Sequence, residues 1–307
     1  MNLITGIEWT DATSNPFKFR DKETGEIVWA CVKHSSGCAN CYSETLAKRY
    51  GRGGPFTKDS MAKVEPFICD KELKQLLNSK KLTGKRVFVG DMTDIFGEWV
   101  TDDMLNKFFH AIENRTDVIF QLLTKRADRM NEYLSWRWGE GRIPSRHIWS
   151  GVSVENQAAA DERIPLLLQT PAAVRFLSCE PLLGPIEFSN VSRRSDAVQQ
   201  LGKKALDGID WVIVGGESGR GARPCRVEWI RSIVEQCKAA GVACFVKQLG
   251  AMPTTECNSE PFNGSCGHAK DPFTGVHHLR LRDKKGGDIS EFSADLRVRQ
   301  FPKAVPA

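Results

Sequence analysis

Three cysteines lie close together near the start of the chain. Cys31, Cys38 and Cys41 stand in the stretch "CVKHSSGCANCY", with the spacing C-x6-C-x2-C. Thiolates at such spacing are ligands for soft or borderline metals, chiefly iron–sulfur clusters and zinc. A closed zinc site takes four ligands, and His34 could supply the fourth here. A cluster that keeps one iron open for a substrate or cofactor takes only three.

The cysteine loop precedes a regular alternation of strand-like and helix-like segments. Apolar runs rich in Val, Ile and Phe predict buried parallel strands, and the segments between them have helical spacing. The alternation predicts right-handed βαβ units and a partial or near-complete parallel (β/α) barrel of six to seven strands. Thr101 and Gly241 carry the start and end signals of two helices. The expected strands are 6–9, 86–90, 118–124, 147–154, 174–180, 211–216 and 243–249, and the expected helices are 41–50, 69–78, 101–114, 125–134, 156–169 and 226–240.

The end of the chain differs in composition from the rest. Residues 1–250 are expected to form the barrel domain and 251–307 an irregular C-terminal extension, because 252–275 is rich in Pro, Gly, Ser and Thr. The stretch 278–292 alternates around two glycines, which predicts a hairpin. Cysteines and histidines also gather here without a standard metal-site spacing, namely Cys257, Cys266, His268, His277 and His278.

Length, composition and net charge limit the classes of protein to which the chain can belong. The 307 residues are 41% hydrophobic and 26% charged, which allows a large core. No apolar run reaches the length of a transmembrane helix, and the first residues lack a secretory signal, so we expect a cytoplasmic protein without a membrane partner. In that reducing compartment, ten cysteines favour metal or redox chemistry over disulfides. The net charge of +5 permits a nucleic-acid partner but does not argue for one.

Polar side chains follow several expected strands, at the ends where a barrel carries its chemistry. The carboxylates after 86–90 could accept a cationic amine, or they could belong to a capped, solvated loop. The polar groups after 147–154 could cap the next helix. The residues are Asp91, Thr93 and Asp94 after the first of these strands, and Ser153, Glu155 and Asn156 after the second.

Two later strand ends add further candidates. Cys179 and Glu180 are adjacent in the expected strand, so only one of the two side chains can point into the barrel. A Cys179 that points inward could donate a hydrogen atom. A buried, inert cysteine is the more frequent case. Gly215 and Gly216 begin a glycine-rich turn whose backbone amides could approach an anion, with Glu217 as a contact for substrate or cofactor. Arg220 and Arg223 add positive charge to this turn.

Basic and aromatic residues follow the strand 118–124. Lys125 and Arg126 either meet an anionic substrate or lie on the exposed face of a helix, and the second interpretation is slightly favoured. The stretch "SWRWGEGR" is compatible with base stacking and phosphate contact, although packing explains such tryptophans more often. Its aromatic and basic residues are Trp136, Trp138, Arg137 and Arg142.

These motifs together resemble a known group of proteins. A three-cysteine loop early in a βα barrel looks like the radical S-adenosylmethionine (radical SAM) superfamily. "IEWTDAT", "GCANCY", "FLSCEPLLGPI" and "WVIVGGESG" resemble a phage and prophage protein family of unknown function, often described as radical-SAM-like, over about residues 6 to 250. The usual superfamily spacing is C-x3-C-x2-C with an aromatic residue before the third cysteine. This chain departs from it, with six residues in the first gap and Asn40 before Cys41.

The resemblance implies a [4Fe–4S] cluster on Cys31, Cys38 and Cys41, whose fourth iron binds S-adenosylmethionine. An electron from a donor such as flavodoxin or ferredoxin would yield a 5′-deoxyadenosyl radical, which removes hydrogen from a substrate. The phage context suits a nucleic acid or nucleotide as that substrate. The candidate cofactor contacts are Asp91, Thr93, Asp94, Ser153, Glu155, Glu180, Gly215 and Gly216, and the candidate catalytic residues are Cys179 and Glu217.

Two other functions remain open at the level of the sequence. One is a zinc-stapled α/β protein that binds nucleic acid without catalysis, with His34 completing the metal site. The other is a metal-dependent hydrolase on the same barrel that uses Asp91, Asp94 and Glu217.

Overall fold

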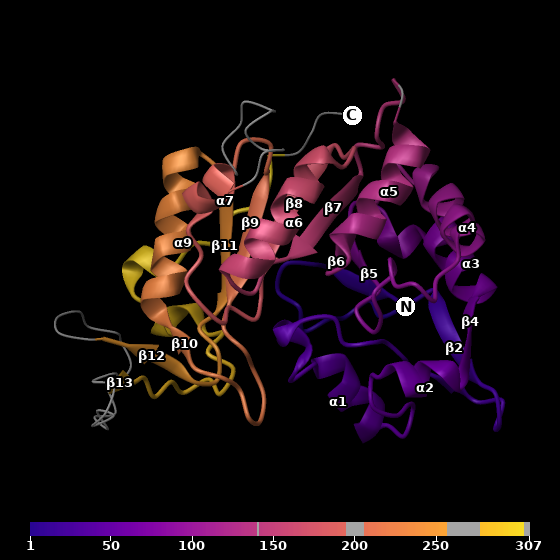
Figure 1. Ribbon diagram of the computed structural model, residues 1–307, viewed down its shortest axis with the longest axis horizontal. Helices are drawn as coiled ribbons and strands as arrows, with labels where there is room; N and C mark the ends of the chain where they lie inside the picture. Colours follow the sequence, from indigo (N-terminus) through magenta and orange to yellow (C-terminus); the bar gives the residue numbers. More distant parts are fainter. Residues whose placement is uncertain (140, 195–205, 257–276, 304–307) are drawn as a thin grey trace. The chain divides into compact units, whose positions relative to one another are not determined.

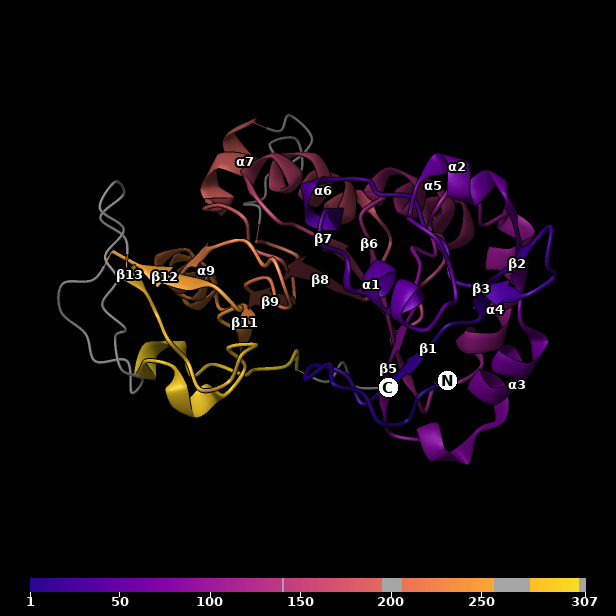
Figure 2. The same ribbon diagram turned by 90° about the horizontal axis from the view of Figure 1, so that it is seen from below.

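The computed structural model describes residues 1–139, 141–194, 206–256 and 277–303 (Figures 1 and 2). Its largest sheet has seven strands in the order β1-β5-β6-β7-β8-β9-β11, and every pairing described within it is parallel. Most of these strands are buried along their length, as their runs of Val, Ile and Phe predict. The strands are β1 (Ala12–Ser14), β5 (Arg86–Val89), β6 (Ile119–Thr124), β7 (Ile148–Ser153), β8 (Val174–Cys179), β9 (Trp211–Gly215) and β11 (Ala243–Gln248).

The seven parallel strands form a curled half-barrel sheet, which agrees with the partial parallel barrel of six to seven strands expected from the sequence. Six of the strands occur where the sequence places them. The expected first strand at 6–9 is wrong. Those residues form a turn in which the Thr10 N–H donates to the Ile7 carbonyl at 3.3 Å. Sheet pairing begins only at Ala12, which lies opposite Val87. A short apolar run therefore precedes the strand without belonging to it.

The described chain divides into two compact units. Among the described residues, unit 1 contains those in 1–152 and 169–175, and unit 2 contains those in 153–168 and 176–303. The division that the sequence suggests at residue 250 stays a prediction.

Unit 1 carries β1, β5, β6 and β7 of the large sheet and a small antiparallel sheet of order β3-β2-β4. This small sheet was not predicted. Its strands are β2 (Phe17–Asp21), β3 (Ile27–Val28) and β4 (Val64–Ile68). The helices of unit 1 are η1 (Ser36–Cys38), α1 (Tyr42–Arg49), α2 (Lys58–Ala62), α3 (Asp70–Asn78), η2 (Lys80–Leu82), α4 (Asp102–Glu113) and α5 (Ala127–Trp138).

Aromatic contacts join the last two helices of unit 1. The ring of Phe109 in α4 lies 5.3 Å from that of Tyr133 and 5.5 Å from that of Trp138, both in α5. The Thr101 hydroxyl accepts the Met104 N–H at 3.3 Å and begins α4, as its residue type predicts.

Unit 2 carries β8, β9 and β11 and a small sheet of order β10-β12-β13. Trp211, Phe245 and Phe301 form its aromatic core, with ring centroids 5.3 to 6.2 Å apart. Gly241 ends α9 with a φ of 70°, as predicted. The remaining elements are α6 (Gln157–Gln169), whose last residue belongs to unit 1, α7 (Phe188–Arg194), β10 (Cys225–Arg226), α9 (Val227–Ala240), β12 (Pro253–Thr255), β13 (His277–His278), η3 (Ile289–Glu291) and η4 (Ala294–Leu296).

The hairpin expected over 278–292 is wrong. Carboxylate side chains in this segment accept hydrogen bonds from backbone N–H groups, which are then not available for pairing between strands. The Glu291 carboxylate accepts the N–H groups of Arg282 and Asp283 at 2.7 and 3.0 Å. The Asp283 carboxylate in turn accepts the N–H groups of Lys285 and Gly287. The segment is therefore a side-chain-capped turn.

Cys257, Cys266 and His268 lie outside the described residues. Within the part of the chain that the structure describes, no helix combines the length and apolarity that crossing a bilayer requires.

Candidate functional site

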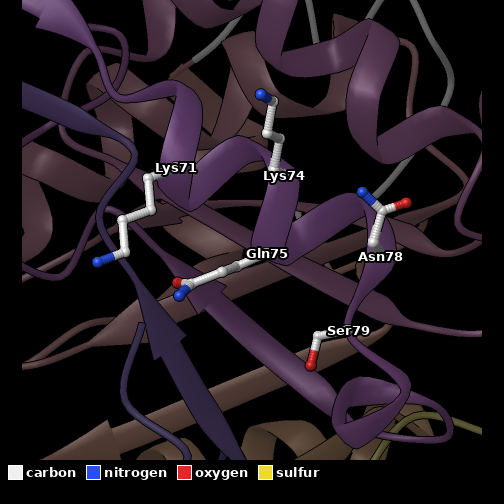
Figure 3. Close-up of a pocket in the computed structure, with 5 residues that line it drawn as sticks. All are labelled: Lys71, Lys74, Gln75, Asn78 and Ser79. Carbon is white, nitrogen blue, oxygen red and sulfur yellow. The ribbon is translucent and has the colours of Figure 1, made fainter.

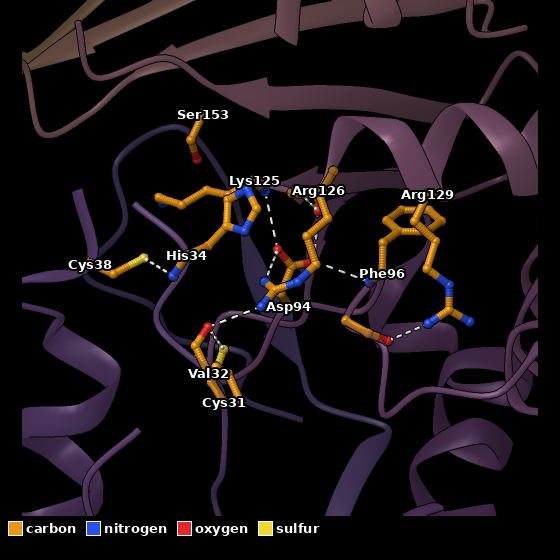
Figure 4. Close-up of polar contacts among 12 residues, drawn as sticks. Cys31, Val32, His34, Cys38, Asp94, Phe96, Lys125, Arg126, Arg129 and Ser153 are labelled. Carbon is orange, nitrogen blue, oxygen red and sulfur yellow. Dashed lines mark hydrogen bonds and ion pairs between the residues drawn. The ribbon is translucent and has the colours of Figure 1, made fainter. Parts of the chain in front are cut away.

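The first end of the cysteine loop is fixed by a buried arginine. Arg126 follows β6, and its guanidinium donates to the Val32 carbonyl at 3.0 Å, next to Cys31 (Figure 4). The same guanidinium pairs with the Asp94 carboxylate at 3.2 Å. Asp94 follows β5, so this contact attaches the loop to the carboxyl ends of two neighbouring parallel strands.

The Asp94 carboxylate is shared among several donors. Besides Arg126, it accepts the Thr124 hydroxyl at 2.7 Å, the Lys125 N–H at 3.1 Å and the Phe96 N–H at 3.0 Å. Arg126 is only 5% exposed, so the favoured interpretation of this residue as part of an exposed helix face is wrong. Asp94 is thus placed to hold Arg126 and the loop, and a contact of Asp94 with a cofactor stays a prediction.

The second end of the cysteine loop is attached to Asp91. The hydroxyl groups of Tyr42 and Ser43, the residues after Cys41, donate to the Asp91 carbonyl at 2.5 and 2.7 Å. The Asp91 carboxylate accepts the side-chain amide of Asn15 at 2.7 Å. Both ends of the loop therefore meet residues at the carboxyl edge of the parallel strands in unit 1.

Burial raises the pKa of the Asp91 carboxyl, although the hydrogen bond from Asn15 lowers it in part. The folded state therefore binds the Asp91 proton more tightly than the unfolded chain does, and ionisation of Asp91 costs stability as pH rises. We expect Asp91→Asn, which keeps an acceptor for Asn15, to unfold at higher urea concentration than the parent at pH 7. The gain should shrink as pH falls towards 3.8, the ordinary pKa of the group. A gain that is independent of pH would show that ionisation of Asp91 is not its cause.

The three cysteines are partly exposed, and none is in a disulfide. The Cys31 thiol donates to the Val32 carbonyl at 3.8 Å, and the Cys38 sulfur accepts the His34 N–H at 3.5 Å. Burial, and then the charge of Asp94, raise the pKa of Cys31 to about 12. Across the described residues, no group of three or more His, Cys, Asp or Glu side chains is gathered closely enough to hold a metal ion.

The cysteine loop nevertheless fits a soft-metal centre in the type and number of its donors. It offers three thiols, and its two ends are fixed while the sulfurs are not gathered. Binding would require the loop to bring its three sulfurs together. It would also require the loss of the Cys31 proton, because thiolates are the ligands.

A buried ion pair in unit 2 joins α6 to the segment that follows β7. Arg163 donates to the Glu155 carboxylate at 2.9 Å and to the Ser153 carbonyl at 2.8 Å. The side chains of Arg163 and Glu155 are 2% and 1% exposed. Asn156 caps α6 by accepting the Ala159 N–H at 3.0 Å, which confirms the simpler interpretation of that residue. A cofactor contact for Ser153 or Glu155 stays a prediction.

Cys179 and Glu180 end β8 in different environments. Cys179 is fully buried, and burial is the main cause that raises the pKa of its thiol. The Glu180 carboxylate pairs with the Lys247 ammonium at 3.1 Å and accepts the Ser178 hydroxyl at 3.3 Å. The packing agrees with an inert Cys179, and hydrogen-atom donation by this residue stays a prediction.

The glycine turn after β9 is needed for close packing of the chain. Gly216 exchanges hydrogen bonds with Gln248, through its N–H at 3.1 Å and its carbonyl at 2.8 Å. A Cβ on Gly216 would lie 2.3 Å from the Leu249 carbonyl oxygen, and one on Gly215 would lie 3.0 Å from the Glu180 carboxylate. The amide of Gly216 is therefore already used within the fold.

Glu217 forms a fork with Arg223. The Arg223 side chain donates to the two Glu217 carboxylate oxygens at 2.9 and 2.6 Å, and the Arg223 N–H donates to one of them at 2.9 Å. Glu217 is 5% exposed. The pair closes the turn 217–223, and a catalytic role for Glu217 stays a prediction.

The other candidates are two tryptophans, two histidines and Thr93. Trp136 and Trp138 belong to α5 and not to a loop, and the Trp138 indole N–H donates to Glu113 at 2.9 Å. His277 and His278 form β13. The Thr93 hydroxyl is buried and has no hydrogen-bond partner among the described residues.

The contacts that fix the cysteine loop were not predicted. Asn15 and Ser43 belong to no recognised motif, and Tyr42 is part of "GCANCY" without a predicted contact. The pairing of Asp94 with Arg126 did leave a signal, because opposite charges followed consecutive strands of a βαβ unit. The carboxyl ends of such strands lie side by side, so the two side chains could have been paired.

Comparison with known proteins gives a family but no chemistry. A family model described as "Protein of unknown function (DUF5131)" matches residues 4–288. No match was found among curated proteins or solved structures. The match includes the cysteine loop and every strand of the large sheet.

Proposed function

Since the chain belongs to the DUF5131 family of proteins of unknown function, we propose its activity from its own residues. The proposal is that Cys31, Cys38 and Cys41 hold a [4Fe–4S] cluster with one iron open to S-adenosylmethionine, and that the parallel sheet is a radical-SAM-like partial barrel. Such a cluster, when reduced, supplies the electron that cleaves S-adenosylmethionine to a radical able to remove hydrogen from a substrate.

The placement of the loop carries the proposal. Arg126 fixes the backbone beside Cys31, and the Asp91 carbonyl fixes the two residues after Cys41. Parallel α/β proteins place their chemistry at the carboxyl ends of the strands. Three soft ligands attached there, without a fourth cysteine in the loop, support a centre with one open position.

The chain's own residues would perform two tasks in this reaction. The Asp94–Arg126 pair orients the loop. The Asp91 carboxylate, in the same unit as the cysteine loop, would accept the amino group of S-adenosylmethionine. The electron would come from a small carrier such as flavodoxin or ferredoxin in the cytoplasm, and the substrate class we propose is a nucleic acid or nucleotide.

Metal and sulfide analysis of protein purified without oxygen and reconstituted with iron and sulfide tests the proposal. We expect about four irons per chain and a paramagnetic resonance spectrum that changes when S-adenosylmethionine is added. Alanine at Cys31, Cys38 or Cys41 should abolish the spectrum. Cys69→Ala is the matched control, because Cys69 is another partly exposed thiol of unit 1 outside the loop, and it should keep the iron.

Other outcomes would contradict the cluster. One zinc per chain and no iron after reconstitution would identify a structural zinc site completed by His34. Iron bound equally by the parent and by all three alanine variants would show that the loop is not the ligand set. Activity on a phosphate ester that persists without the cysteines would favour the hydrolase instead.

A further inference from the structure

The end of α1, the connection to α2 (both labelled in Figure 1) and the first residue of α2 form a basic stretch of unit 1 that contains no acidic residue. Residues 48–58, which we call the basic turn, read KRYGRGGPFTK and include four cations. The nearest carboxylates along the chain are Glu44 and Asp59. Within the basic turn, the Tyr50 side chain is 62% exposed. The segment thus combines positive charge with an accessible aromatic ring.

Backbone contacts fix the shape of the basic turn. The Arg52 N–H donates to the Ala47 carbonyl at 2.8 Å, and the Arg52 carbonyl accepts the Trp29 N–H at 2.7 Å. Gly53 has a φ of +143°, and a Cβ there would lie 2.3 Å from the Trp29 carbonyl oxygen, so this position requires glycine. None of these contacts uses the side chain of Arg52 or Tyr50. The fold therefore presents both side chains without depending on them.

Two cations of the basic turn are exposed and have no partner in the described structure. Neither Arg49 nor Arg52 forms an ion pair or a side-chain hydrogen bond with a described residue. The buried Arg126 and Arg163 are instead paired with Asp94 and Glu155. Guanidinium groups bind phosphates in a forked geometry, so the two arginines of the turn suit a chain of phosphates.

From these observations we propose that the basic turn binds single-stranded nucleic acid. Arg49 and Arg52 contact the phosphates, and the exposed ring of Tyr50 stacks on an unpaired base. The pairing of free cations with an exposed ring selects a single strand, because bases in a duplex are already stacked on each other. This surface does not depend on a cluster at Cys31, Cys38 and Cys41, and it can be tested on protein without iron.

Two other surfaces each lack one part of this combination. A depression of about 580 Å³ beside α3 is lined by lysines and amides but by no aromatic ring (Figure 3). A second depression of about 440 Å³ has the exposed Trp136, but both of its arginines have partners. Arg137 is paired with Glu113 at 2.6 Å, and the Arg142 side chain donates to the Arg137 carbonyl at 2.9 Å. The residues around the first are Lys71, Lys74, Gln75, Asn78 and Ser79.

Fluorescence anisotropy with a labelled oligothymidylate, followed over a salt series, tests the proposal. We expect Arg49→Ala/Arg52→Ala to bind more weakly and to lower the salt slope by about 1.4, since each lost single-strand phosphate contact is worth about 0.7. Tyr50→Ala should weaken binding by about tenfold without changing the slope, and Tyr50→Phe should bind as the parent does. All of these variants should unfold like the parent, because the substituted side chains hold nothing in the fold.

The charge-matched control is Lys71→Ala/Lys74→Ala, which removes two exposed cations from the depression of Figure 3. Parent-like binding by this control places the strand on the basic turn. Equal weakening by the control would mean a diffuse attraction to any positive surface, and the proposal would fall. It would also fall if the parent did not bind at low salt. A duplex bound as tightly as the single strand and unaffected by Tyr50→Ala would exclude stacking.

Discussion

Replacing Arg126 with methionine should lower the free energy of unfolding by about 3–5 kcal/mol. The methionine retains much of the apolar volume but leaves the Asp94 carboxylate, whose side chain is 10% exposed, without its cation. It also removes the donor to the Val32 carbonyl and the stacking of the guanidinium on Trp99, at 4.7 Å from the ring centroid. Urea unfolding followed by tryptophan fluorescence measures the loss.

Hydrogen exchange distinguishes a specific loss of the contacts that Arg126 makes with the cysteine loop from a general loss of stability. Amides of residues 31–41 should exchange faster in Arg126→Met than in the parent under conditions where the rest of the sheet stays protected. Arg86→Met is the matched control in the same unit, because its pair with Asp11 is partly exposed, at 24% and 37%, and should cost less than about 1 kcal/mol. Equal losses in the two variants, or unchanged exchange of the loop, would contradict the role of Arg126.

The large sheet could be predicted because local sequence determines it. Strands such as 211–215 are apolar on both faces, and that pattern needs no knowledge of the partner strand. The helix signals at Thr101 and Gly241 are likewise local, since each depends on one residue and the turn beside it. The prediction of the first strand was wrong because β1 has only three residues and its register is determined by β5, which is distant in sequence.

The contacts of the candidate site depend on pairs that are distant in sequence. Arg126 and Asp94 are 32 residues apart, and Tyr42 and Asp91 are 49 apart. A charged residue at a strand end looks solvated unless its partner is known, which explains why Arg126 was expected on a surface. The small sheet of β2, β3 and β4 was not predicted for a related reason. Its strands are short and one contains Pro66, a residue that usually argues against a strand.

A second large effect is expected in unit 2, where Arg163→Met should lower the free energy of unfolding by about 3–5 kcal/mol. The Glu155 carboxylate is 1% exposed, so water cannot replace the lost guanidinium. The Ser153 carbonyl loses a donor in the same variant. Urea unfolding of the parent and the variant at neutral pH gives the difference.

The double variant Glu155→Gln/Arg163→Met distinguishes a buried charge from a packing defect. If the unpaired carboxylate causes the loss, neutralising it should recover much of the stability, because a buried pair can be replaced as a whole at little cost. Arg231→Met breaks a partly exposed pair with Asp295, at 28% and 42%, and should cost less than about 1 kcal/mol. No recovery in the double variant would mean that Arg163 acts through its packing and its bond to Ser153. In that case the buried charge of Glu155 would be tolerated without a partner.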